Sequence, residues 1–117
     1  MKIGQLAKAT RTQVETIRFY EREGLLSEDA RTDGNYRLYA DSHVGRLSFI
    51  RQCRLLDMPL DDIRALLRLR DKPRKSPKAD QLLTECLERV VEHMQELTRL
   101  KAELKGLRAI SARKTAG

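Results

Sequence analysis

The sequence is short of aromatic residues, cysteine and long apolar runs, and each shortage excludes a kind of protein. Aromatic residues make up 4% of the 117 positions and Trp is absent, so large core side chains are scarce. Two cysteines, Cys53 and Cys86, are too few for a disulfide framework or for a four-cysteine zinc site within one chain. No apolar run approaches the roughly 20 residues that span a membrane, and the first residues do not form a signal peptide. We therefore expect a small cytoplasmic protein that holds no cofactor and no metal.

Catalytic motifs are missing as well. The most evident feature that the sequence does have is an excess of positive charge. We find no converging pair of carboxylates, no Ser-His-Asp set and no phosphate-binding glycine loop, so we do not expect an enzyme. Lys and Arg number 24 against 17 Asp and Glu, which gives a net charge of +7. This balance favours an anionic polymer as partner, nucleic acid before a membrane surface. Composition alone leaves ordinary solubilising charge as the alternative.

Two short helices are predicted at the start of the chain. Apolar residues at helical spacing indicate one helix that ends near Thr10 and a second that runs to Glu23 and stops at Gly24. Thr10 or Thr12 can cap the second helix, with Glu15 three residues after Thr12 in a capping-box arrangement. Two short helices separated by about three residues are typical of a helix-turn-helix, although other helical hairpins share the pattern.

A β-hairpin is predicted next, over residues 31–39. Asp33-Gly34-Asn35 has the chemistry of a tight turn, and residues 36–39 alternate as in a strand. Arg31 precedes the tip and Arg37 follows it. The hairpin is therefore predicted to be a basic wing, placed to straddle a phosphate backbone.

Two amphipathic helices are predicted after the hairpin. The first is capped by Asp41 or Ser42 and carries Cys53 on its apolar side, where we expect a buried structural cysteine. The second begins at Pro59, whose missing N–H is harmless in a first helical turn. These helices complete a winged helix-turn-helix domain over residues 1–71.

The rest of the chain predicts one long helix. Two prolines within residues 72–78 mark a linker, residues 79–110 follow without a break, and residues 111–117 are expected to form a short disordered tail. Apolar residues repeat every seven positions in two series offset by three, as in the seam of a coiled coil. The predicted dimerisation residues are Leu83, Val90, Leu97, Leu100, Leu104 and Leu107, and Cys86 and His93 occupy the remaining seam positions. A single helix cannot bury this seam, so we favour a coiled coil between two subunits over packing against the chain's own first domain.

Several segments resemble the MerR family of bacterial transcription regulators. The resemblance lies in residues 1–10, 15–26, 31–39 and 43–60, and the last segment is most similar to the cadmium- and lead-responsive branch. It implies a mainly α fold, in which a winged helix-turn-helix domain is followed by a long dimerisation helix that pairs as an antiparallel coiled coil. It further implies a homodimer that binds a palindromic promoter element and distorts an over-long spacer, so that RNA polymerase can engage both promoter elements.

The resemblance also implies DNA contacts at the positions that match the family. The predicted contacts are Arg18 and Tyr20 on the second helix, Arg31, Tyr36 and Arg37 in the wing, and Arg54 on the third helix. Guanidinium groups form strong charge-assisted bonds to phosphate, and tyrosine hydroxyls form neutral ones. Tyr36 and Tyr39 could instead pack the wing against the domain. Arg54 could instead be an ordinary surface charge of its helix. Glu15 is a poor phosphate partner, but it could accept a hydrogen bond from a cytosine amino group.

The sequence departs from the family at the positions of the metal-binding cysteines. Metal-sensing members have one cysteine at the head of the dimerisation helix and a pair in a loop beyond its end. Residues 75–78 and 110–117 contain neither Cys nor His, and the sequence ends before such a loop, so we expect the inherited metal site to be absent. Cys86 and His93 lie roughly 10 Å apart along the helix axis and cannot share one metal within a chain. A metal or redox role of Cys86, including an intersubunit disulfide, stays open.

Two functions are consistent with these features. The first is a promoter-specific regulator of the MerR type whose effector response is lost or altered. The second is an accessory protein that bends DNA without an effector and is similar to the small winged-helix excisionases. The coiled coil favours the first, because a dimer reads two half-sites and sets their spacing. The missing sensory cysteines favour the second.

Overall fold

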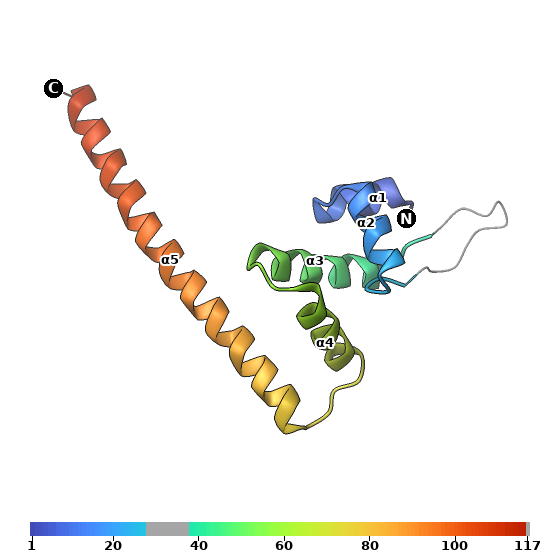
Figure 1. Ribbon diagram of the computed structural model, residues 1–117. Helices are drawn as coiled ribbons and strands as arrows, with labels where there is room; N and C mark the ends of the chain where they lie inside the picture. The colour runs from blue at the N-terminus through green and yellow to red at the C-terminus, as the bar shows by residue number, and fades with distance from the viewer. Residues whose placement is uncertain (28–37, 117) are drawn as a thin grey trace. The chain divides into compact units, whose positions relative to one another are not determined.

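The computed structural model describes residues 1–27 and 38–116, which form five helices and no strand (Figure 1). The helices are α1 (Ile3–Thr10), α2 (Val14–Arg22), α3 (Asp41–Leu55), α4 (Leu60–Asp71) and α5 (Pro77–Ala116). They fall into two units, Met1–Pro73 and Arg74–Gly117. The first unit holds α1 to α4 and the second holds α5. None of the helices described is both long enough and apolar enough to cross a membrane.

The helix-turn-helix at the start of the chain is present, but its turn differs from the prediction. Arg11 ends α1 in the left-handed conformation, with a φ of 53°. The chain then continues through Thr12 to Gln13, which is the N-cap of α2 and makes no side-chain cap bond. The predicted capping box is therefore wrong. The Thr12 hydroxyl donates to the carbonyl of Thr10 at 3.1 Å, and the Glu15 carboxylate accepts from Arg18 instead of reaching back.

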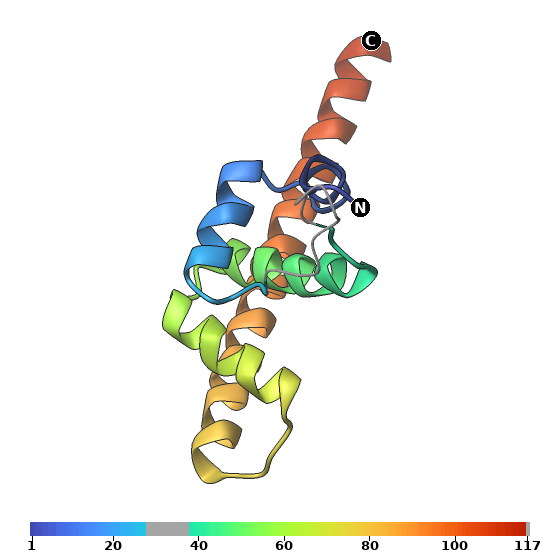
Figure 2. The same cartoon turned by 90° about the vertical axis from the view of Figure 1, so that its right-hand side faces the viewer.

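The first unit has a small apolar core. α1 packs against α2 and α3 (Figure 2), and the fully buried side chains are Leu6, Ile17, Leu25, Leu26, Leu47, Ile50, Ile63 and Leu67. Burying such a side chain stabilises the fold by about 1.5–3 kcal/mol. Cys53 is 5% exposed on the buried side of α3, as the sequence predicted. With no tryptophan to fill space, this core consists mostly of leucine and isoleucine.

Gly24, Ala40 and Pro59 mark the end of α2, the start of α3 and the start of α4. Gly24 follows α2 with a φ of 74°, the left-handed conformation typical of glycine after a helix. At α3 the predicted caps are wrong, because the N-cap is Ala40 and both Asp41 and Ser42 lie within the first turn. Pro59 precedes Leu60 directly and starts α4, as predicted.

The long helix α5 exceeds its predicted bounds at both ends. It begins at Pro77, where the Ser76 hydroxyl accepts the N–H of Ala79 at 3.0 Å, so the predicted linker is two residues shorter. It ends at Ala116, so residues 111–116 continue the helix instead of forming a disordered tail. The reason is local, because Ser111-Ala112-Arg113-Lys114 contains no glycine or proline and includes good helix formers.

Candidate nucleic-acid interface

One face of α2 is polar and exposed, and it is the natural candidate for contact with nucleic acid. Glu15, Arg18 and Arg22 are exposed, whereas Ile17 and Glu21 are buried. The exposed positions follow the spacing i, i+3 and i+7, which is one side of a helix. Arg18 donates to the Glu15 carboxylate at 3.2 Å, and their side chains are 50% and 78% exposed. Arg18 is one of the contacts predicted from the sequence, whereas Arg22 is not, although the same spacing indicates it.

Tyr20 lies on the other side of α2, in the core. It is only 7% exposed, and its ring centre is 5.8 Å from that of Phe19. A groove contact by the ring is therefore excluded in this conformation. The DNA contact predicted for Tyr20 is therefore reduced to a phosphate contact through its hydroxyl, the only polar group of the side chain.

Arg54 is exposed near the end of α3, where α3 turns into α4. One of its amino groups donates to the carbonyl of Met58 at 3.1 Å, and Asp57 in this turn has a φ of 57°. The bond to Met58 uses one of the five guanidinium donors. The side chain is thus oriented by the turn, and the role predicted for it remains a proposal.

The predicted wing lies almost wholly outside the described residues, which include neither Arg31 nor Tyr36 nor Arg37. Its last residue, Tyr39, is described and is 3% exposed. The Tyr39 hydroxyl donates to the carboxylate of Glu21 at 3.0 Å. Its backbone exchanges hydrogen bonds with Met1 in both directions, each 2.7 Å long. The packing alternative for Tyr39 is therefore confirmed.

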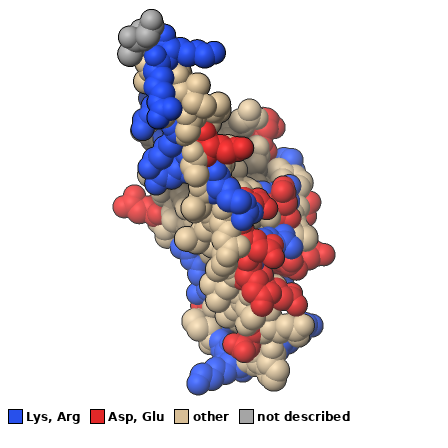
Figure 3. Space-filling model, turned by 90° about the vertical axis from the view of Figure 1, so that its left-hand side faces the viewer, with Lys and Arg blue, Asp and Glu red and all other residues tan. Residues whose placement is uncertain are grey.

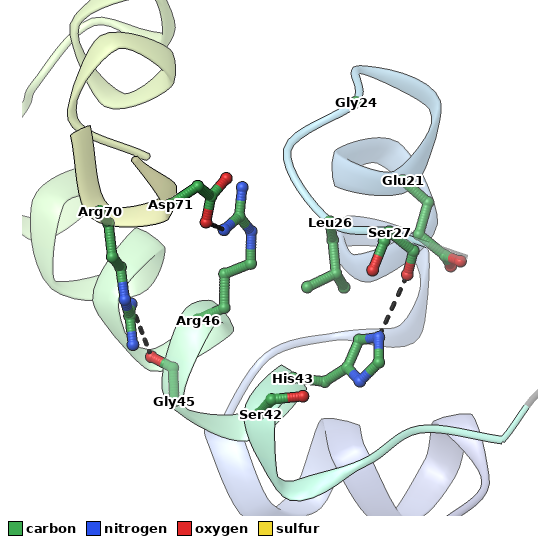
Figure 4. Close-up of a pocket in the computed structure, with 10 residues that line it drawn as sticks. All are labelled: Glu21, Gly24, Leu26, Ser27, Ser42, His43, Gly45, Arg46, Arg70 and Asp71. Carbon is green, nitrogen blue, oxygen red and sulfur yellow. Dashed lines mark hydrogen bonds and ion pairs between the residues drawn. The ribbon is translucent and has the colours of Figure 1, made fainter. Parts of the chain in front are cut away.

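His43 completes a buried polar cluster with Tyr39 and Glu21, and sequence reasoning missed it. It is 3% exposed, and its ring meets that of Tyr39 edge to face at 5.2 Å. Figure 4 shows its hydrogen bond to the carbonyl of Ser27, which is 3.2 Å long. A histidine in the first turn of a helix and a glutamate in the last turn give no sequence signal of burial, since both positions are usually polar and exposed.

A hollow of about 710 Å³ lies between the end of α2, the start of α3 and the end of α4. The Arg46 side chain extends across it. Its Nε donates to the carbonyl of Leu25 at 2.7 Å. Its Nη1 pairs with Asp71, also at 2.7 Å (Figure 4). Arg70 donates to the carbonyl of Gly45 at 3.4 Å and stacks over the ring of Phe49. These bonds join the segments around the hollow, so its arginines serve the packing of the domain.

Within residues 1–27 and 38–116, no group of three or more His, Cys, Asp or Glu side chains is arranged to hold a metal ion. Cys86 is half-buried on α5 and His93, one heptad later, is half-buried as well. The thiolate ligands of the metal-sensing members have no counterpart at the head of α5, where the sequence is Lys75-Ser76-Pro77-Lys78.

Comparison with known protein families shows which family the chain belongs to. Residues 1–69 match the model of the MerR HTH family regulatory proteins, and residues 44–107 match a second model, described as MerR, DNA binding. The chain belongs to the MerR family. The resemblance inferred from the sequence is confirmed, and so is a helical fold with a DNA-binding domain and a long helix.

Known MerR regulators align with almost the whole chain. A Haemophilus influenzae protein named as a homolog of the HTH-type transcriptional regulator ZntR is 42% identical over 109 residues, covering 92% of this chain and 81% of that protein. The lead(II) complex of the regulator PbrR691 from Ralstonia metallidurans CH34 is 49% identical, with a TM-score of 0.65, and the match covers 92% of this chain and 84% of that one.

A third comparison concerns the fold alone. The regulator HiNmlR, which lacks a sensor domain and was solved on promoter DNA, is 23% identical with a TM-score of 0.71, over 85% of this chain and 76% of that one. The two chains share a fold. The chain is a DNA-binding transcription regulator, and its relatives are regulators too.

Proposed function

We propose that this MerR regulator acts in the cytoplasm as a homodimer that binds a palindromic promoter spacer and distorts it for RNA polymerase. The observation that carries the proposal is the apolar stripe of α5. The stripe consists of Leu83, Leu87, Val91, Met94, Leu97, Leu100, Leu104, Leu107 and Ile110, each between 43% and 64% exposed. A contiguous apolar stripe of this length is rare on the surface of a monomer and marks an interface. A second copy of α5 is the occupant that its heptad spacing fits.

The charges of α5 favour an antiparallel pair. From Pro77 to Leu100 the helix carries five acidic and three basic residues, and from Lys101 to Ala116 it carries one acidic and five basic residues. On the face that Figure 3 presents, the basic side chains gather toward the C-terminal end. An antiparallel partner places the basic half of each helix beside the acidic half of the other, whereas a parallel partner places like halves together.

The seam also suggests a register for the antiparallel pair. In an antiparallel pair, each seam residue of the series that contains Leu83 lies at the same height along the axis as a residue of the partner's other series, the one that contains Cys86. Every seam position finds a partner when Leu83 lies level with Leu107 of the partner subunit, and Cys86 with Leu104 of the partner subunit. In this register the pair is symmetric about residue 95 and leaves no seam residue unmatched.

Two DNA-binding domains joined in this way would each place α2 at a half-site. Arg18 and Arg22 supply the positive charge of that helix, and Arg54 would add a phosphate contact from the end of α3. Arg31, Tyr36 and Arg37 would hold the backbone from the wing. We retain Tyr20 only for a contact through its hydroxyl.

An effector-independent DNA-bending protein is the second candidate, supported by the absence of a thiolate at residues 75–78. Sequencing of the DNA bound by the full chain in cells separates the two candidates. One or a few promoters with a palindrome in the spacer would support the regulator. Binding spread evenly over the genome would support the bending protein and contradict promoter-specific regulation.

A further inference from the structure

The antiparallel register proposed for α5 also determines which side chains flank the seam of the dimer. One flank consists of the positions just before the Leu83 series, and the other of the positions just after the Cys86 series. The first flank is formed by Leu82, Arg89, Glu96, Glu103 and Ile110, and the second by Asp80, Leu87, Met94, Lys101 and Arg108. In an antiparallel pair each flank lies beside the same flank of the partner subunit, where charged side chains form the ion pairs that set orientation.

The charges on both flanks are complementary in this register. The pair is symmetric about residue 95, so Arg89 lies beside Glu103 of the partner subunit. On the other flank, Asp80 lies beside Arg108 of the partner subunit. Symmetry repeats each of these contacts once. Opposite charges across a helix pair favour one orientation and one register, so both contacts support the antiparallel arrangement.

Glu96 is the one flank residue from Asp80 to Ile110 whose counterpart carries the same charge. It directly follows the symmetry centre at residue 95, so it lies beside Glu96 of the partner subunit. Two carboxylates at facing positions repel each other and destabilise the pair. A cation between them would convert this repulsion into attraction. The centre of the dimer therefore has a local need for positive charge, which the complementary flank pairs do not have.

His93 is a seam residue next to this pair of carboxylates. It is half-buried and lies three residues before Glu96, so the two side chains share one side of α5. In the proposed register the two copies of His93 are separated along the axis by four residues, roughly 6 Å at 1.5 Å per residue. Both copies lie on the side of the seam where the two glutamates meet. Two imidazoles and two carboxylates, one of each from each subunit, thus converge on the two-fold axis.

We propose that the centre of the α5 dimer binds a divalent metal ion of the zinc class through His93 and Glu96 of both subunits. Imidazole nitrogens and carboxylate oxygens are zinc ligands, and four of them complete its tetrahedral shell. Each chain supplies only two, which agrees with the absence of any group of three or more such ligands within residues 1–27 and 38–116 of one chain. The proposal rests on the proposed function, because the site exists only in the antiparallel dimer.

Titration of zinc chloride into the untagged full chain tests this site. We expect calorimetry to show one zinc ion bound per dimer. Only the dimer holds the complete ligand set, so zinc should stabilise the dimer against dissociation by mass action. At a zinc concentration about ten times its dissociation constant, the dissociation constant of the dimer should fall about tenfold. Sedimentation of a dilution series with and without zinc measures this change.

Four variants identify the ligands. His93→Leu removes both imidazoles and keeps the seam apolar, so we expect a dimer that forms without zinc and does not respond to it. Glu96→Gln removes two ligands together with the repulsion between them, so its dimer should be tighter than the wild type without zinc and should gain much less from zinc. Glu88→Gln removes an exposed carboxylate from the opposite side of α5 and is the matched control. It should respond like the wild type, and so should Cys86→Ser.

The outcomes separate the site from the dimer. A wild-type dimer that binds no zinc, or a His93→Leu dimer that keeps the full response, would overturn the site and leave the dimer intact. One zinc ion per chain would overturn it as well, since a shared site holds one ion per two chains. Loss of the response in Cys86→Ser would assign the ion to the thiol instead. A chain that stays monomeric at every concentration, with and without zinc, would refute the proposed dimer and the site with it.

Discussion

The polar face of α2 combines an arginine suited to DNA with a carboxylate that DNA repels. Arg18 and Glu15 are paired on the surface, where such ion pairs are worth at most about 1 kcal/mol. A phosphate or a base edge can therefore displace the carboxylate from Arg18 at little cost. If α2 contacts DNA as proposed, Glu15 is a negative charge at the interface, which would penalise every sequence that offers it no donor.

Removing the Arg18 guanidinium should weaken DNA binding and change its response to salt. We expect Arg18→Ala to lose about tenfold in affinity and to make the plot of log affinity against log salt concentration shallower by about one unit per subunit. Titration of a labelled duplex at several salt concentrations measures both. Arg68→Ala, which removes an exposed charge from α4, is the control and should change neither. Equal effects of the two variants would contradict a direct contact by Arg18.

Neutralising Glu15 should lower specificity while raising general affinity. Glu15→Gln keeps the shape of the side chain and removes its charge, so we expect random-sequence duplexes to bind severalfold more tightly. The ratio of promoter to random-sequence affinity should fall, because the amide accepts less strongly from a cytosine amino group. Competition between the two duplexes measures this ratio. An unchanged ratio would mean that Glu15 takes no part in recognition.

At the scale of the helix, α5 is the element whose sequence is least compatible with a monomer. Its 40 residues carry a half-exposed apolar stripe from Leu83 to Ile110. Covering such side chains stabilises an assembly by about 25 cal/mol for each Å² removed from water.

Charges placed in the seam should dissociate the dimer. Leu97→Lys combined with Leu104→Lys buries four ammonium groups per dimer without partners, and unpaired buried charges each destabilise by several kcal/mol. We expect sedimentation to show a monomer at concentrations where the wild type is a dimer. Gln95→Lys combined with Ala102→Lys adds the same charges on the opposite side of the helix and should leave the dimer intact. A dimer of unchanged stability in the first variant would show that α5 is not the interface.

At the scale of the whole molecule, the orientation of the two α5 helices in the proposed dimer decides how far apart its DNA-binding domains lie. The proposed antiparallel register places Cys86 level with Leu104 of the partner subunit. Two copies of Cys86 are then separated along the axis by the length of 18 residues, roughly 27 Å at 1.5 Å per residue. A parallel pair would instead place the two Cys86 thiols level with each other.

Oxidative cross-linking distinguishes these orientations. We expect Leu104→Cys, which retains the native Cys86, to form a covalent dimer on mild oxidation, because the two thiols come within disulfide range in the antiparallel register. The wild type, with Cys86 alone, should remain uncross-linked in non-reducing gels. Efficient cross-linking of the wild type would refute the antiparallel pair and support an intersubunit disulfide at Cys86.

The response to soft metals is a further property of the assembled regulator. Residues 75–78 offer no thiolate, and one thiol at Cys86 cannot chelate a soft ion or select among metals. We expect lead, cadmium and mercury ions to leave both the DNA affinity and the promoter opening of this chain unchanged. Titration of each ion into the protein–DNA complex measures the response. A sub-micromolar effect that Cys86→Ser abolishes would contradict the prediction and identify the seam as a sensor.

The sequence alone determined the features that depend on local chemistry and periodicity. Gly24 marks the end of α2, Pro59 the start of α4, and the heptad spacing of α5 an apolar stripe whose leucines are exposed. These features could be predicted because a left-handed turn, a missing N–H or a repeat of seven acts through neighbours in the chain. The motifs of residues 1–60 likewise sufficed to place the chain in its family.

The tertiary structure decided which polar residues are buried. Glu21 and His43 look like surface residues in the sequence, and the sequence left packing open for Tyr39. All three are buried because each bonds to another of them or to a backbone group elsewhere in the chain. Such partners are separated by up to 38 residues, as Met1 is from Tyr39, and no local pattern records them. The cap predicted for α3 was wrong for a related reason. The helix starts one residue earlier, at the N-cap Ala40, whose N–H donates to Nδ1 of the buried His43.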